Sequence, residues 1–387
     1  MKIKLSQAFD LQMGKTPARN NAAYWNGSKK WVSIADIGNS GKYIADTKEC
    51  ITDKGVRESG IKAVPKETVI MSFKLSIGKT AITAEELYTN EAIMAFIDKG
   101  IYAIDPAYFY HLCCGKNWTA GTNKAVMGLT LNKATISGIE INIPDIAEQR
   151  KIAARLDCLD TVIADRQLQL EYLDQLVKSR FIELFGDSEF NTMQWPTEKL
   201  SELCDVSSSK RIYQNEQSTE GVPFLRISDL NERIDNVKNA PELFIPINKY
   251  NELKENGLVP TEGDILVTSR GTLGRCYIVR PEDEFYFQDG MISWLSDLSH
   301  QITSLYLSQL FAMSGIQKQI ASLQAGSTVA YLSISMLKKL DIMLPPLNLQ
   351  NQFAAFVEQT DKSKLAVQKS LEELEILKKS LMQQYFG

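Results

Sequence analysis

At 387 residues the chain is too long for one ordinary hydrophobic core and suits two or more domains. Hydrophobic residues make up 44% of the chain and charged residues 23%, which are ordinary values for a globular protein. No apolar run approaches the roughly 20 residues needed to span a bilayer, and the first residues lack the apolar core of a signal peptide. These features argue against a membrane protein and predict a cytoplasmic one.

The net charge of −4 argues at first against a nucleic-acid-binding protein. The charge is unevenly distributed, since residues 1–145 carry 18 Lys and Arg against 14 Asp and Glu, whereas residues 190–343 carry 14 against 19. A DNA-binding function would therefore require basic residues to gather on one face, because phosphate contacts supply much of the affinity. The six cysteines show no paired C-x-x-C spacing and are interpreted as reduced.

The first 145 residues predict a mixed α/β domain. A β-rich run is expected at Trp31–Ile37. A second β-rich segment, residues 68–79, contains a polar turn that ends in a glycine and a basic residue. Another apolar strand is expected at Thr80–Thr83. Asp105-Pro106 is typical of a helix start and predicts a helix over 106–114.

A long helix is predicted over residues 149–184. Its apolar side chains recur at alternating spacings of four and three, as a coiled-coil seam requires. Ile-Pro-Asp at 143–145 and Phe-Gly-Asp at 185–187 mark its ends. The apolar seam residues are Ile152, Leu156, Leu159, Ile163, Leu170, Leu173 and Val177.

Residues 189–343 repeat the plan of the first domain. Phe224–Leu230 parallels Trp31–Ile37, and the segment 264–275 parallels 68–79, with a strand expected at 276–279. Asp297 is the expected N-cap of a helix over 298–313. The two recognisable halves therefore predict two domains of the same class.

A second long helix is predicted over residues 350–385. Its apolar seam residues are Phe353, Val357, Val367, Leu371, Leu374 and Leu381. The segments 143–186 and 344–387 align without gaps at a constant separation of 201 residues and share 14 identities in 44 positions, which indicates an internal duplication.

The duplication predicts the architecture. Neither long helix can bury its apolar stripe alone, so we expect the two helices to pack antiparallel as a rod of roughly 54 Å. The fold class is then mixed α+β: two α/β domains joined by two long antiparallel coiled-coil helices, with pseudo-twofold symmetry and the domains at opposite ends. The predicted segments are 1–145 and 189–343 for the domains, and 146–188 and 344–387 for the helices.

The residues give no sign of a catalytic or metal site. The two histidines, His111 and His300, lie far apart in predicted helices, which argues against a triad or a zinc site. Gly-Lys-Thr occurs at 14–16 and 78–80 without the first glycine of a phosphate loop. Asp105–Tyr108 resembles the Asp-Pro-Pro-Tyr motif of amino-methyltransferases, but no glycine-rich cofactor loop accompanies it and a helix cap explains the residues.

Several stretches resemble the specificity subunits of type I restriction–modification systems. Residues 14–37 resemble the opening of a target-recognition domain of that family. Residues 209–230 and 266–274 resemble the other common form of that opening. The helix entries at 143–150 and 344–350 also resemble the family, in the family's order over essentially the whole chain; Asn351 departs from it, since Arg150 stands at the matching position.

This resemblance implies that each domain reads one half of a split double-stranded DNA target and that the helices set the gap between the halves. Two modification subunits would dock on the helices and supply S-adenosylmethionine-dependent N6-adenine methylation. Restriction subunits that use ATP and magnesium would add cleavage. The chain itself would hold no catalytic residue, metal or cofactor. Two alternatives stay open: an equivalent subunit of another split or fused restriction–methylation system, and a non-DNA coiled-coil scaffold protein.

Candidate DNA contacts follow from the side chains that read base edges, with Arg and Lys suited to guanine, Asn and Gln to adenine, and Ser and Thr to either. In the first domain they are Lys15, Thr16, Arg19, Asn20, Lys29, Lys74, Ser76, Lys79, Asn123 and Lys124. In the second domain they are Lys210, Arg211, Tyr213, Arg226, Ser269, Arg270, Thr272, Arg275, Gln288, Ser327 and Thr328. Trp25, Trp31 and Phe224 are expected in the core.

Overall fold

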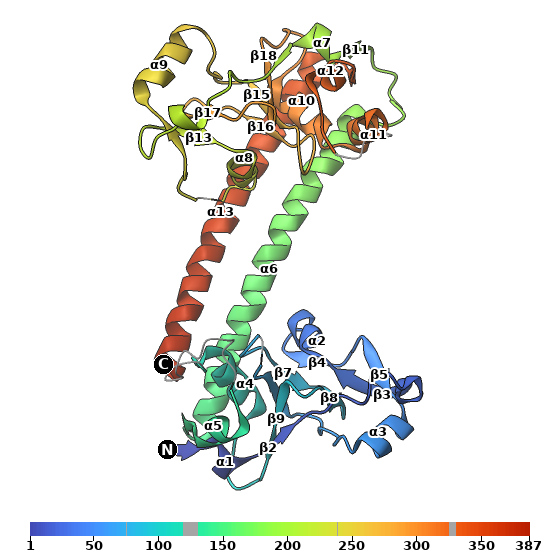
Figure 1. The fold of residues 1–387 in the computed structure, drawn as a ribbon, viewed down its shortest axis with the longest axis vertical. Coiled ribbons are helices and arrows are strands. Elements are labelled where there is room, and N and C mark those ends of the chain that lie inside the picture. Colours follow the sequence, from blue (N-terminus) through green and yellow to red (C-terminus); the bar gives the residue numbers. More distant parts are fainter. Residues whose placement is uncertain (75, 119–130, 238, 325–329) are drawn as a thin grey trace. The chain divides into compact units, whose positions relative to one another are not determined.

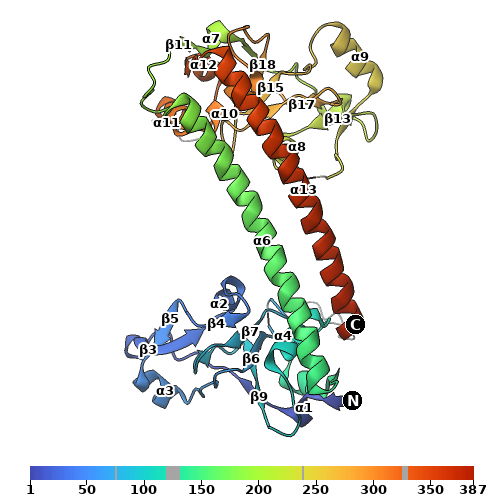
Figure 2. The same cartoon turned by 180° about the vertical axis from the view of Figure 1, so that it is seen from behind.

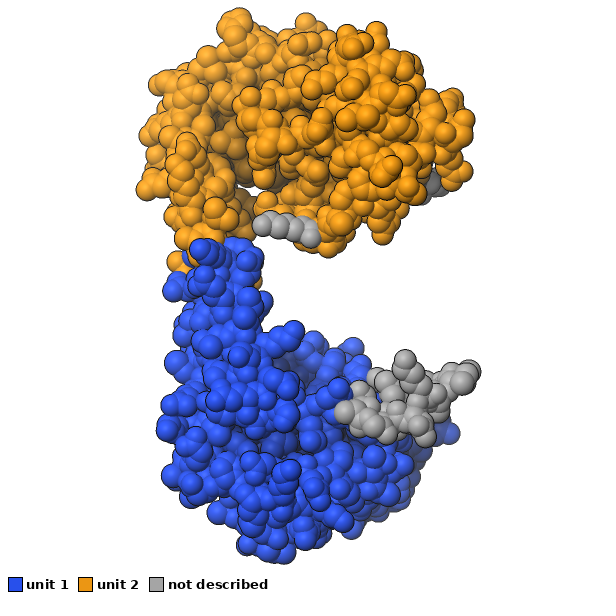
Figure 3. Space-filling model, turned by 90° about the vertical axis from the view of Figure 1, so that its left-hand side faces the viewer, with its two compact units in different colours: residues 1–168, 367–387 blue, residues 169–366 orange. Residues whose placement is uncertain are grey.

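The computed structural model describes residues 1–387 except 75, 119–130, 238 and 325–329. The chain divides into two compact units, coloured separately in Figure 3. Unit 1 consists of Met1–Leu168 and Val367–Gly387, and unit 2 of Gln169–Ala366. Each unit therefore holds one α/β domain and parts of both long helices. In the described part of the chain, no helix is long and apolar enough to cross a membrane.

Unit 1 is built on a five-stranded sheet whose strands are antiparallel except for one parallel pair, β4 with β7 (Figure 1). In sheet order the strands are β2 (Phe9–Met13), β9 (Ile93–Asp98), β6 (Val69–Ser72), β7 (Thr80–Thr83) and β4 (Tyr43–Ile44). Helix α4 (Pro106–Gly115) packs on this sheet, where Phe9, Phe96 and Phe109 form a ring cluster. The rings are almost wholly buried, so they anchor the helix to the strands.

A smaller sheet and several short elements complete the domain of unit 1. The sheet has the order β5 (Glu49–Ile51), β3 (Trp25–Val32) and β8 (Tyr88–Thr89). Strand β1 (Lys2–Lys4) pairs with β10 (Glu140–Asn142). The remaining helices are α1 (Leu5–Ala8), the short 3-10 helix η1 (Ala22–Tyr24), α2 (Ile34–Asn39), α3 (Asp53–Ser59) and α5 (Lys133–Gly138).

Unit 2 repeats this plan. Its four-stranded sheet has the order β12 (Asp205–Ser207), β18 (Ile292–Ser296), β15 (Ile265–Thr268) and β16 (Cys276–Ile278). The smaller sheet has the order β14 (Phe244–Ile245), β13 (Val222–Leu225) and β17 (Tyr286–Phe287), and β11 (Thr197–Lys199) pairs with β19 (Asp341–Met343). The domain's helices are α7 (Leu200–Leu203), η2 (Gln214–Glu216), α8 (Ile227–Ile234), α9 (Ile247–Glu255), α10 (Ser304–Phe311), α11 (Ser314–Leu323) and α12 (Ile334–Leu337).

The two long helices are α6 (Ile146–Phe185) and α13 (Leu347–Phe386), seen from both sides in Figures 1 and 2. In unit 1, Asp160 pairs with Lys378 at 2.5 Å, and Arg155 donates a hydrogen bond to Tyr385 at 3.1 Å. As residue numbers rise along α6 they fall along α13, so the helices are antiparallel. The expected pair of long antiparallel helices is confirmed, three residues longer at each start and one longer at each end.

Unit 2 shows the same antiparallel contact. Asp174 of α6 pairs with Lys364 of α13 at 2.7 Å, and the Arg180 guanidinium lies 5.7 Å from the centre of the Phe356 ring. The lysines at seam positions 364 and 378 thus each meet an aspartate of α6. All thirteen apolar residues expected in the seam are buried or half-buried.

The duplication extends to a buried glutamine at the start of each long helix. The side chain of Gln149 accepts a hydrogen bond from the backbone N–H of Asp105 and donates to the carbonyls of Ala103 and Pro144, each at 2.9 Å. Gln350 makes the same three bonds in unit 2, with the backbone of Thr303, Gln301 and Pro345. Both glutamines are fully buried, and each amide satisfies three backbone groups at the start of its long helix.

One predicted helix starts in the wrong place. The helix expected over 298–313 begins at Ser304, with Thr303 rather than Asp297 as its N-cap. Asp297 has a left-handed backbone (φ 49°), and His300 lies in the turn before α10, not in a helix. The expected helix start at Asp105 is confirmed, because the Asp105 carboxylate accepts from the first backbone N–H groups of α4.

Candidate nucleic-acid interface

A hydrogen-bonded hairpin loop joins β15 to β16 in the main sheet of unit 2. The Thr268 hydroxyl donates to the carbonyl of Thr272 at 2.5 Å and accepts from the backbone of Arg275 at 3.0 Å. Gly271 has a φ of 70°, which glycine adopts without strain. The loop therefore holds the exposed side chain of Arg270 at a fixed point of the backbone.

The β6–β7 loop of unit 1 has the same hydrogen bonds. Ser72 donates to the carbonyl of Ser76 and accepts from the backbone of Lys79, and the backbone of Gly78 donates to the Ser72 carbonyl. Lys74 occupies the position that Arg270 has in unit 2. The two units thus present basic residues on loops held by the same hydrogen bonds. We call this shared arrangement, residues 72–79 in unit 1 and 268–275 in unit 2, the loop frame.

The candidates of unit 2 converge on the turn after β17. The backbone of Ser269 donates to Met291, and the Ser208 hydroxyl bonds both Gly290 and Ile292, so the hairpin and the segment 208–213 flank the same turn. Gln288 donates its backbone N–H to Leu225, the residue before Arg226. These bonds bring five candidate DNA-contacting residues to the same turn: Lys210, Arg211, Arg226, Arg270 and Gln288.

The equivalent turn in unit 1 lies at residues 89–92. The backbone of Lys15 donates to Thr89 at 2.8 Å, and Phe73 donates to Ala92 at 2.9 Å. Asn90 donates to Val32 at 3.0 Å, the bond that Gln288 makes in unit 2. Asn90 thus occupies the position of Gln288, and the sequence reasoning missed it because the loose alignment before the helices stopped short of this turn.

A close approach of backbone fixes the entry to this frame in unit 1. A Cβ atom on Gly14 would lie 2.1 Å from the carbonyl oxygen of Asn90 and 2.2 Å from that of Thr89. Only glycine fits between these groups. The following residues, Lys15 and Thr16, are therefore held beside the turn.

The exposure of the candidates divides them into three groups. Those with exposed side chains are Lys15, Arg19, Asn20, Ser76, Lys79, Lys210, Arg211, Tyr213, Arg270 and Thr272. Those half-buried are Thr16, Lys29, Lys74, Arg226, Arg275 and Gln288. Ser269 is buried and its hydroxyl bonds that of Ser293 at 2.8 Å, so the hypothesis that its side chain contacts DNA is corrected. Asn123, Lys124, Ser327 and Thr328 lie outside the described residues.

Several candidate arginines are engaged by carboxylates within their own unit. Arg211 pairs with Asp289 at 2.8 Å, and this carboxylate raises the pKa of the guanidinium. Arg226 pairs with Glu242 at 2.7 Å, and Arg275 pairs with Asp235, whose pKa it lowers. Contact with a base or phosphate would compete with these partners.

In unit 1, Arg19 is engaged in the same way. It pairs with Glu49 and lies 4.0 Å from the ring centre of Trp25 and 4.8 Å from that of Trp31. Trp31 and Phe224 are buried, as expected, whereas Trp25 is only partly so. Arg19 therefore has a local structural role in this domain.

Residues 1–172 and 193–376 match the family model described as the type I restriction modification DNA specificity domain. The chain belongs to this family. Family membership favours DNA recognition over the scaffold alternative.

Relatives and solved structures agree with this assignment. The MjaIX type I restriction enzyme specificity subunit of Methanocaldococcus jannaschii is 24% identical over 98% of this chain and 90% of its own length. A chain from a structure of type I R-M complex assembly and conformational transition covers 100% of this chain and 97% of its own, with a TM-score of 0.65 and 17% identity. The S subunit of the M. genitalium type I system covers 100% and 96%, with a TM-score of 0.54 and 16% identity.

In this specificity-family protein His111 of α4 takes part in a polar bridge with Asp157 and Lys42. Its Nε2 lies 2.7 Å from Asp157 of α6, and Lys42 bonds both oxygens of the same carboxylate at 2.6 and 2.7 Å. Burial lowers the pKa of His111, and the hydrogen bond to Asp157 opposes this shift. The described residues contain no group of three or more metal-ligating side chains. Tyr108 is buried and donates to the carbonyl of Asn142, as a core residue would.

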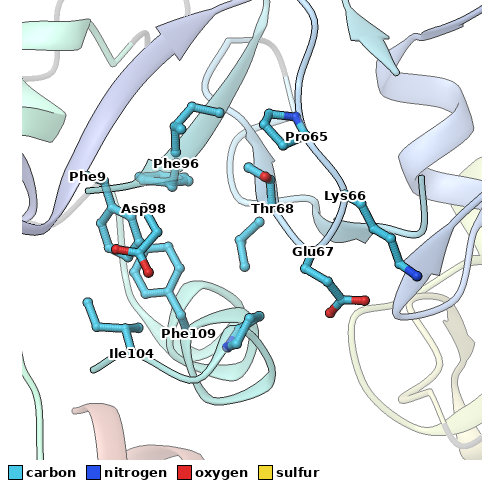
Figure 4. Close-up of a pocket in the computed structure, with 12 residues that line it drawn as sticks. Phe9, Pro65, Lys66, Glu67, Thr68, Phe96, Asp98, Ile104 and Phe109 are labelled. Carbon is cyan, nitrogen blue, oxygen red and sulfur yellow. The ribbon is translucent and has the colours of Figure 1, made fainter. Parts of the chain in front are cut away.

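A cavity of about 320 Å³ lies in unit 1 away from the loop frame (Figure 4). Phe9, Phe96 and Phe109 line one side, and Lys66 and Glu67 line another. None of the residues expected to contact DNA lines it. In this DNA specificity protein the cavity is therefore separate from the candidate interface.

Proposed function

We propose that this chain is the DNA-recognition subunit of a type I restriction–modification complex and that its two domains read different halves of a bipartite target. The duplicated loop frame carries the proposal. Both units hold a hairpin loop beside a polar turn by the same backbone bonds, yet the side chains on that frame differ, as with Lys74 and Arg270. Equivalent frames with different side chains are suited to two half-sites of different sequence.

Among the candidates, those without an internal carboxylate partner are the better readers. Exposed donors on a rigid loop can reach base edges without first breaking an ion pair. Arg270 and Lys210 in unit 2, with Lys79 in unit 1, fit this description among the described residues. Lys74 also has no carboxylate partner, but it is half-buried. The ion-paired arginines would instead stabilise the loops in which they lie.

The long helices would set the gap between half-sites and bind two modification subunits. In unit 2, Tyr172 and Leu176 lie four residues apart, so they share one face of α6, and both are exposed. On α13, Leu365 is 73% exposed and Ile376 69% exposed, at positions outside the seam. Exposed apolar side chains of this size are typical of protein–protein contact surfaces.

In the assembled complex the chemistry would lie in the partners. Modification subunits would use S-adenosylmethionine to methylate adenine at N6, and restriction subunits would use ATP and magnesium to cleave. The complex would act in the cytoplasm. This chain would contribute recognition and spacing, with no catalytic residue of its own.

The direct test is DNA binding by the chain assembled with its modification subunits. We expect the logarithm of the association constant for DNA to fall linearly with the logarithm of salt concentration, because basic residues displace counterions from phosphate. We also expect no methyl transfer by the purified chain with S-adenosylmethionine alone. A gel-shift titration at several salt concentrations and a methyl-transfer assay measure both. Binding without salt dependence would support a scaffold, and methylation by the chain alone would reopen Asp105–Tyr108 as a catalytic motif.

The docking surface gives a separate prediction. Leu365→Asp combined with Ile376→Asp should weaken assembly with modification subunits by about tenfold or more, because apolar contacts at an interface centre dominate its energy. The melting temperature of the free chain should stay unchanged, since both side chains are exposed. Isothermal titration with the modification subunit measures the effect. Gln359→Asp, at another exposed position of α13, is the matched control. Equal affinity of the unaltered protein, the double variant and the control would refute docking at Leu365 and Ile376.

A further inference from the structure

Arg270 differs from the other candidate arginines of unit 2 in what supports it. Its guanidinium carbon lies 5.7 Å from the ring centre of Tyr331. Among the described residues, no carboxylate lies within ion-pairing distance of Arg270, whereas Arg211, Arg226 and Arg275 all have one. A carboxylate occupies guanidinium donors, but an aromatic face leaves the N–H edge available.

The backbone fixes Tyr331 beside Arg270. The two residues form an isolated antiparallel bridge, and the next residue, Leu332, donates its N–H to Ser269 at 3.0 Å. Leu332 and Ser269 are both buried, which anchors the bridge to the core. Tyr331 is 36% exposed, so it lies at the surface with Arg270.

We propose that Tyr331 is a positioning residue for base recognition by Arg270, an inference that rests on the proposed DNA-binding function. A cation–π contact with the ring would restrict the rotation of the guanidinium and leave its N–H donors free for the two acceptors of a guanine. Tyr331 and Arg270 are far apart in the sequence, and nothing in the sequence alone indicates that they are neighbours. Its position comes from the isolated bridge between Arg270 and Tyr331.

The test uses the full chain assembled with its modification subunits. The probe is a set of duplexes carrying the target, as identified by mapping methylated adenines in host DNA, with each base pair replaced in turn. Arg270→Ala should reduce discrimination at one base pair by about 5- to 150-fold. Tyr331→Ala should reduce discrimination at that same base pair by about two- to fivefold, whereas Tyr331→Phe, which keeps the ring, should match the unaltered protein.

The double variant separates positioning from a merely structural role. If Tyr331 acts through Arg270, Tyr331→Ala has no further effect on discrimination in the Arg270→Ala background. An undiminished effect there, a uniform loss on every duplex, or full discrimination by Tyr331→Ala would overturn the inference. Failure of the unaltered complex to bind any duplex in a salt-dependent way would instead contradict the proposed function. Melting temperatures of the unaltered protein and the four variants identify any variant that fails to fold.

Discussion

Replacing Leu371 by aspartate is expected to lower the free energy of unfolding by about 3 kcal/mol or more, because a buried apolar contact is lost and a charge is placed in the seam. Leu371 is 7% exposed on the face of α13 that packs against α6. Denaturant unfolding followed by circular dichroism measures the change. Leu371→Ala should account for the packing part alone, about 2–4 kcal/mol.

The matched control for this substitution lies on the same helix. Leu365→Asp introduces the same charge at a position that is 73% exposed, and surface changes of this kind usually alter stability by about 0.5 kcal/mol or less. A large difference between the two variants attributes the effect to the seam. Equal, small effects would show that α13 does not bury its apolar stripe.

Gln350→Leu is expected to cost about 3 kcal/mol or more, although leucine is apolar and the site is fully buried. The substitution leaves the N–H of Thr303 and the carbonyls of Gln301 and Pro345 without their partner, and each orphaned buried group costs about 1–3 kcal/mol. Denaturant unfolding measures the loss of stability. Hydrogen exchange should show faster exchange at Thr303, the N-cap of α10.

Two companions make this prediction specific. Gln149→Leu should have the same effect in unit 1, with faster exchange at Asp105, because its bonds are equivalent. Gln352→Leu, at an exposed position of α13, should be nearly neutral. Retained protection of Thr303 in Gln350→Leu would mean that the glutamine does not hold this helix start.

The long helices and the duplication could be predicted from the sequence because their signal is local. A seam pattern repeats every seven residues, and it survives in both copies even where Lys364 and Lys378 replace apolar residues. The start of α10 could not be predicted in this way. Asp297 is a good cap by composition, but the helix starts at Ser304, where Gln350 from another part of the chain binds the capping residue.

The candidate interface could be predicted only in outline. The polar turn around Arg270 was recognisable from a basic residue and a glycine between two apolar strands. The sequence did not show which basic side chains are paired with carboxylates, because Arg211 and its partner Asp289 are 78 positions apart. Burial of Ser269 and the position of Asn90 likewise depend on strands brought together by the fold.

The composition of unit 1 has a consequence for synthesis of the protein. Its domain is translated first, yet residues 367–387 belong to the same unit, where Phe386 packs on Tyr108 with ring centres 5.5 Å apart. All of unit 2 leaves the ribosome before those residues do, a delay of about 10–40 s at ordinary rates of elongation. During that interval the nascent chain presents an uncovered apolar face on α4. Within this chain, unit 1 can therefore be completed only after the whole of unit 2 has been translated.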